Sequence, residues 1–151
     1  MHSNSYGAEV AAAIARQKDK PGALLPLLHD IQDRLGYVPP DALPAIARAL
    51  NLSRAEVHGV VSFYHHFRST RPGRHVLRIC RAEACQAMGA DELLSHVESS
   101  LKAKTGETSK DGRFTLEAVY CLGNCACSPA VMIDNDLHGR VTPQRFDELV
   151  K

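Results

Sequence analysis

The sequence contains no tryptophan, and its four Phe and four Tyr residues make up only 5% of its 151 residues. We therefore expect a core built mostly from Ala, Leu, Val and Ile. An excess of either charge is also missing, since 18 basic and 17 acidic side chains leave a net charge of +1. Nucleic-acid binding calls for a concentrated basic face, so this balance argues against a nucleic-acid partner. A content of 44% hydrophobic and 23% charged residues is that of a globular protein.

Long apolar runs are missing as well. No stretch approaches the roughly 20 residues that a membrane helix needs, so we expect no membrane insertion. Residues 1–6 have neither the basic region nor the apolar region of a secretory signal. These absences predict a cytoplasmic protein, in which five cysteines are better explained as metal ligands or redox groups than as structural disulfides.

Residues 1–70 have the pattern of helices separated by prolines. Between residues 24 and 35, Leu and Ile recur at steps of three and four, which is the period of one helix face. Gly36 ends that helix, and Ser53 with Glu56 three residues later forms a capping box that opens another. We predict an N-terminal helical segment that is too small for a hydrophobic core of its own and therefore packs against a partner protein.

The pattern changes after a polar turn cluster at residues 68–74, and residues 71–151 form the second predicted domain. The elements expected there are a strand at 75–80, a helix at 90–102, strands at 114–120, 130–134 and 137–141, and a helix from 142 to 149. This β-α-β-β-α order predicts a small α/β sandwich. With the helical segment before it, the fold class is α+β.

Four cysteines form two pairs, Cys80 with Cys85 and Cys121 with Cys125, and each pair begins where a predicted strand ends. Because neighbouring strands can present their C-terminal ends at one edge of a sheet, we expect four thiolates on loops at that edge. The spacing alone does not choose the metal, since both structural zinc and iron–sulfur clusters accept four thiolates. The long, open loops favour a cluster, and a zinc scaffold is the alternative.

Other chemistries lack their motifs. No His lies within four residues of a cysteine, which argues against a Rieske centre with its two His ligands. A thiol–disulfide enzyme needs a C-x-x-C motif, and the sequence has none. Glycine-rich nucleotide-binding motifs are absent too, so the chain has no recognisable site for NAD or a flavin.

The residues around the second cysteine pair resemble a known family. Residues 120–131, Y-C-L-G-N-C-A-C-S-P-A-V, are similar to the second half-site of the thioredoxin-like [2Fe–2S] ferredoxins, whose pattern is C-L-G-x-C followed by a short linker and Pro. Residues 56–64, E-V-H-G-V-V-S-F-Y, resemble the family's helix-to-loop signature, and the L-G-Y-V-P turn at residues 35–39 also fits. The resemblance runs from about residue 20 to the end of the chain.

This resemblance implies a thioredoxin-like domain at residues 71–151 and one [2Fe–2S] cluster held by Cys80, Cys85, Cys121 and Cys125. It also implies an electron-transfer subunit that is not catalytic by itself and that docks beside an FMN-bearing, NAD-binding partner. Residues 80–86, C-R-A-E-A-C-Q, look most like the γ subunit of NAD-dependent formate dehydrogenases. The equivalent subunits of respiratory complex I and of bidirectional hydrogenases are the alternatives.

Two features can be explained either by packing or by a functional role. Cys127 is interpreted as a small buried side chain rather than as a fifth ligand, because the family pattern places the ligands at Cys121 and Cys125. The aromatic residues Phe63, Tyr64 and Phe67 either pack the helical segment or contact a partner subunit, and the sequence favours neither role.

Overall fold

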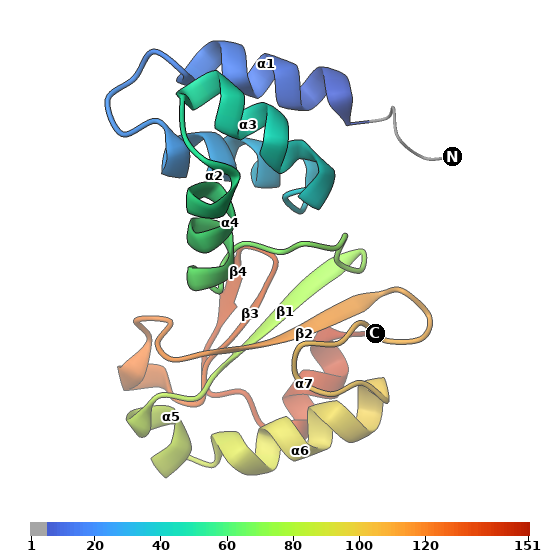
Figure 1. Ribbon diagram of the computed structural model, residues 1–151. Helices are drawn as coiled ribbons and strands as arrows, with labels where there is room; N and C mark the ends of the chain where they lie inside the picture. Colours follow the sequence, from blue (N-terminus) through green and yellow to red (C-terminus); the bar gives the residue numbers. More distant parts are fainter. Residues whose placement is uncertain (1–5) are drawn as a thin grey trace. The chain divides into compact units, whose positions relative to one another are not determined.

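The computed structural model describes residues 6–151, and the chain folds as two compact units (Figure 1). One unit ends at Arg71 and the other runs from Pro72 to Lys151. The helices of the first unit are α1 (Gly7–Gln17), α2 (Leu24–Leu35), α3 (Leu43–Leu50) and α4 (Arg54–Phe63), with a 3-10 turn η1 (Pro40–Ala42) before α3. None of the helices within residues 6–151 has the length and apolar character needed to cross a membrane.

The helix ends of the first unit follow local sequence rules. Gly36 follows α2 with a φ of 85°, a left-handed conformation that glycine adopts without strain. At the start of α4, Ser53 Oγ accepts a hydrogen bond from Glu56 N at 3.1 Å, and Glu56 Oε2 accepts one from Ser53 N at 2.8 Å. The predicted capping box is therefore confirmed.

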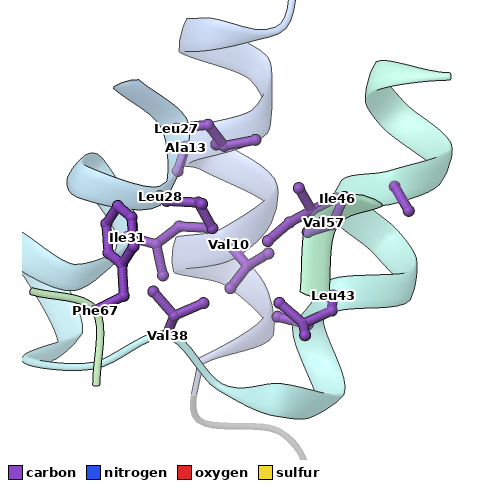
Figure 2. Close-up of a cluster of buried hydrophobic side chains, with 12 residues drawn as sticks. Val10, Ala13, Leu27, Leu28, Ile31, Val38, Leu43, Ile46, Val57 and Phe67 are labelled. Atoms are coloured by element: carbon purple, nitrogen blue, oxygen red, sulfur yellow. The ribbon is translucent and has the colours of Figure 1, made fainter. Parts of the chain in front are cut away.

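The first unit has an apolar core of its own, contrary to our expectation (Figure 2). Its buried side chains are Val10, Ala13, Leu27, Leu28, Ile31, Val38, Ala42, Leu43, Ile46, Ala47, Val57 and Phe67. Two of them, Val38 and Phe67, lie outside the helices, where helix periodicity gives no signal. The buried side chain of Gln32 holds the segment around Phe67 in place by donating to His66 O at 2.7 Å and accepting from Arg68 N at 2.8 Å.

The second unit is a mixed sheet with helices. Its elements are β1 (His75–Cys80), α5 (Glu83–Ala87), α6 (Ala90–Leu101), β2 (Phe114–Val119), a 3-10 turn η2 (Cys125–Cys127), β3 (Val131–Ile133), β4 (Asp136–His138) and α7 (Pro143–Leu149). The strand order is β2-β1-β3-β4, with β1 parallel to β2 and β3 antiparallel to both β1 and β4. The predicted α+β fold class is thus confirmed. The hairpin strands β3 and β4 are shorter than predicted, and α5 was not predicted.

Helices α6 and α7 cover one face of this sheet, below the strands in Figure 1. Leu93 and Val97 of α6 and Phe146 of α7 are fully buried there with Leu77 and Leu116 from the strands. A second, smaller buried cluster, Cys80, Cys85, Ala90 and Ala130, is separate from this core. The thiols of the first cysteine pair are therefore not part of the main apolar core.

Candidate functional site

The two strands that lead to the cysteine pairs are parallel neighbours, as predicted. Cys80 is the last residue of β1 and is in register with Val119, the last residue of β2. Cys121 follows Val119 by two residues. Parallel strands end at the same sheet edge, so the first cysteine of each pair follows its strand at this edge.

The first pair is fully buried. Cys80 and Cys85 are only 2% and 1% exposed, and their thiols are hydrogen-bonded to each other. Cys85 lies within the short helix α5 and not on an open loop as expected. Gln86 holds that turn in place, because its backbone N donates to Ala82 O at 2.9 Å and its side-chain Nε2 donates to Arg81 O at 3.0 Å.

The loop that carries the second pair supplies hydrogen bonds to the first. The backbone N–H of Leu122 donates to Cys80 Sγ, and that of Ala130 donates to Cys85 Sγ. Ser128 Oγ lies 3.5 Å from Cys85 Sγ. The two half-sites are therefore already joined through backbone and hydroxyl groups, and N–H donors to sulfur are the contacts that tune iron–sulfur clusters.

These contacts shift the pKa values of the two buried thiols in opposite directions. Burial raises the pKa of the Cys80 thiol. Burial also acts upward on Cys85, but hydrogen bonds that its thiolate accepts from Ser128, Ala130 and Cys80 outweigh it and lower the pKa of that thiol. Cys85 is thus the member of the pair that gives up its proton more readily, and a thiolate is the form that binds metal.

The second pair is placed differently. Cys121 and Cys125 are exposed, Cys127 is partly buried, and all five cysteines are free thiols. Gly123 N donates to Cys121 Sγ at 3.3 Å. Within residues 6–151, no three His, Cys, Asp or Glu side chains are arranged so that they could hold one metal ion. The structure therefore brings Cys80 and Cys85 together and leaves Cys121 and Cys125 outside that pair.

The chemistry of the site still suits a thiolate-bound cluster. Both pairs follow parallel strands at one sheet edge, and main-chain donors of the second loop already reach the first pair. Arg81 follows Cys80 directly, and its Nε is buried without a hydrogen-bond partner in the described part of the chain. Its guanidinium is paired with a carboxylate through Nη2, which donates to Asp91 Oδ1 at 3.0 Å. Four thiols that start from one sheet edge are the kind of donor that a thiolate-bound cluster requires.

Cys127 is held against the residues that directly follow β4. Its carbonyl accepts a hydrogen bond from Arg140 N at 2.7 Å. At Gly139 an added Cβ would lie 2.7 Å from Cys127 Cβ and 2.9 Å from Cys127 O, which is too close for any side chain. This contact favours the packing role of Cys127, which stays a prediction.

The three aromatic residues Phe63, Tyr64 and Phe67 do not share one role, since one packs in the core and two are exposed. Phe67 is 8% exposed and belongs to the core of the first unit. Phe63 and Tyr64 are 72% and 43% exposed, which leaves them available to a partner.

Comparisons with known proteins find similar sequences and a similar structure. The family model described as "Thioredoxin-like [2Fe-2S] ferredoxin" matches residues 10–151. The E subunit of NADH-quinone oxidoreductase from Pseudomonas aeruginosa is 37% identical over 134 residues, which cover 89% of this chain and 81% of that protein. The HndA subunit of the NADP-reducing hydrogenase from Solidesulfovibrio fructosivorans is 33% identical over 142 residues, which cover 94% of this chain and 83% of that protein. A solved NAD+-reducing [NiFe]-hydrogenase chain, 27% identical, superposes with a TM-score of 0.72 over 89% of this chain and 23% of its own length.

Proposed function

The chain belongs to the thioredoxin-like [2Fe–2S] ferredoxin family and its cofactor is a [2Fe–2S] cluster, and we propose that Cys80, Cys85, Cys121 and Cys125 are the ligands. The observation that carries this proposal is the parallel register of β1 and β2, which starts both cysteine pairs from one sheet edge. The family assignment replaces the structural zinc site as the interpretation of these four cysteines.

When bound, such a cluster accepts and donates single electrons. The protein contributes the surroundings: Cys80 and Cys85 are packed among small buried side chains, where hydrogen bonds act at low dielectric. The backbone N–H groups of Leu122 and Ala130 donate to sulfur and favour the more negative, reduced state. Cys121 and Cys125 are exposed, so the second half-site faces the side from which an electron can be exchanged with another protein.

The chain is an electron-transfer subunit of an NAD-linked multisubunit oxidoreductase, and we propose that it is not catalytic by itself. We propose that it works in the cytoplasm beside an FMN-bearing, NAD-binding subunit that converts the two-electron chemistry of NADH into single-electron steps. Membership of a formate dehydrogenase as its γ subunit stays a prediction from residues 80–86. The relatives from Pseudomonas aeruginosa and Solidesulfovibrio fructosivorans are subunits of NADH-quinone oxidoreductase and of a hydrogenase, and these parent complexes fit equally well.

A pull-down with spectroscopy tests this function. The full chain, tagged and purified anaerobically from its own cells, should bring down a larger subunit that contains FMN. Peptide mass spectrometry of that complex then identifies the catalytic subunit as acting on formate, quinone or hydrogen. The chain separated from its partners should be reducible by dithionite and inert toward NADH and formate. NADH oxidation by the separated chain, free of contaminating flavoprotein, would overturn the proposal.

A further inference from the structure

Ser128 contacts both half-sites through one hydroxyl group. Its side chain is buried at 8% exposure. The hydroxyl donates to Cys125 O at 2.8 Å and lies 3.5 Å from Cys85 Sγ, a residue 43 positions away in the sequence. Among residues 6–151, Ser128 is the residue whose side-chain hydroxyl is hydrogen-bonded to a cysteine sulfur. Ser128 is therefore placed to connect the ligand pairs.

A count of protons shows what must change when the site is filled. With a neutral thiol, Cys85 S–H donates to Ser128 Oγ, and the single hydroxyl proton of Ser128 goes to Cys125 O. A cysteine sulfur bound to iron has released its proton to solvent and can only accept. The contact between Ser128 and Cys85 then persists as a hydrogen bond only if the hydroxyl turns and donates to the sulfur.

This turn also changes a contact with the second half-site. Cys125 O loses its hydrogen-bond donor when the hydroxyl rotates away. Cys125 is exposed, and in this structure the second pair is not gathered with the first into a group that could hold a metal ion. The turn therefore exchanges a hydrogen bond to the backbone of Cys125 for one to the sulfur of Cys85.

We propose that Ser128 is a positioning residue for the cluster, whose hydroxyl turns from Cys125 O to Cys85 Sγ when the cluster is bound. This inference rests on the proposed ligands. A hydrogen bond to a ligand sulfur stabilises the reduced cluster, which is the more negative state, so Ser128 raises the reduction potential. A purely structural role, in which Ser128 only fills space before Pro129, makes no contribution to the potential.

The test compares Ser128→Ala with the full-length wild-type chain. The potential is measured by a redox titration followed by EPR, and exchangeable protons near the cluster are measured by pulsed EPR in H2O and D2O. Ser128→Ala should keep two iron per chain, shift the potential to more negative values, and lose one exchangeable-proton coupling. Ser128→Thr retains a hydroxyl and should restore both signals.

The matched control is Ser109→Ala. Ser109 is buried to a similar degree, at 6% exposure, and its hydroxyl accepts from Phe114 N at 3.0 Å, away from the cysteines. This control should leave the potential and the proton couplings unchanged. If Ser128→Ala matches the wild type in both signals, the inference is wrong while the proposed function stands.

Two further outcomes are decisive. If Ser128→Ala holds no cluster, Ser128→Thr decides between the roles: a cluster with the wild-type potential supports the hydroxyl, and loss of the cluster from both variants shows that side-chain size matters instead. Absence of iron from the wild-type chain would overturn the proposed function itself.

Discussion

The two units of the chain bury different chemistry. The unit that ends at Arg71 buries an apolar cluster and, among its described residues, Gln32 is the one fully buried polar side chain. The unit that begins at Pro72 has an apolar core as well, but it also buries a separate group of small side chains that includes two thiols, Cys80 and Cys85. The stability of the helical unit and the binding of the iron–sulfur cluster therefore depend on different residues. Substitutions in the helical unit should change its stability and leave the iron–sulfur cluster in place.

The largest effect is expected at a ligand. Cys125→Ser replaces a soft thiolate by a harder and less acidic hydroxyl, which iron accepts poorly, so most of the cluster absorbance and iron content should be lost. Cys127→Ser is the matched control and should keep the cluster, at a cost in unfolding free energy of about 1 kcal/mol. Cluster loss from Cys127→Ser alone, with Cys125→Ser unaffected, would move the ligand position by two residues.

The next effect belongs to the helical unit. Leu28 is fully buried in its core, and Leu28→Ala should lower the stability of that unit by about 2–5 kcal/mol because a cavity remains. Circular dichroism during urea unfolding measures the loss, and the visible spectrum of the cluster should be unchanged. Loss of the visible absorbance of the iron–sulfur cluster in Leu28→Ala would show that the two units do not act separately.

Removal of residues 1–70 should likewise leave a coloured domain, and its binding to the partner protein should be weaker than that of the full chain.

A smaller effect is expected at Gly139, which directly follows β4 and lies against the second cysteine loop. Gly139→Ala places a Cβ within 2.9 Å of Cys127 and within 2.7 Å of Asn124 Nδ2, so the loop must shift. Overpacking of this kind costs about 1–3 kcal/mol, and here it should also lower the iron content. Gly59→Ala is the control, since an added Cβ there meets nothing within 4 Å. Equal iron content in both variants would contradict the close contact between Gly139 and Cys127.

The smallest effect concerns an ion-pair cluster on the helical unit. Asp30 accepts hydrogen bonds from Arg16 Nε at 3.0 Å and Arg34 Nε at 2.9 Å, and the Arg16 bond is the main cause that lowers the pKa of Asp30. Because the folded-state pKa is depressed, the stabilisation is complete above the ordinary pKa of about 3.9 and is lost as pH falls below it.

Asp30→Asn should therefore lower the unfolding free energy by about 1 kcal/mol at pH 7, because the arginines that pair with Asp30 are partly exposed to solvent. The difference from wild type should shrink as the pH falls below about 4, as measured by urea unfolding over a pH series. Asp33→Asn, at an exposed position of the same helix, is the control and should have little effect. A constant difference between pH 7 and pH 3 would show that Asp30 is not stabilised by its charge.

Sequence patterns predicted what is local or periodic. The capping box at Ser53, the end of α2 at Gly36 and the parallel edge that joins Cys80 to the second pair all follow from such patterns. Two features needed the three-dimensional structure. Val38 enters the core of the helical unit from a loop, and α5 is only five residues long, too short for a helical period to appear.

The candidate site was predictable only in its cysteines. The hydrogen bonds that join the half-sites come from Leu122 and Ala130 through backbone groups, which leave no trace in side-chain patterns. Ser128 lies 43 residues from Cys85, and nothing in its local sequence distinguishes it from a linker residue.

Elemental analysis of the anaerobically purified, full-length chain is the most direct test of the central claim, that these thiolates hold a two-iron cluster. Iron, acid-labile sulfide and zinc are measured together with the visible spectrum of the same sample. We predict two iron and two sulfide per chain in a red-brown protein, all lost when Cys80, Cys85, Cys121 and Cys125 are replaced together by Ser. A colourless chain with stoichiometric zinc and no iron would contradict the claim.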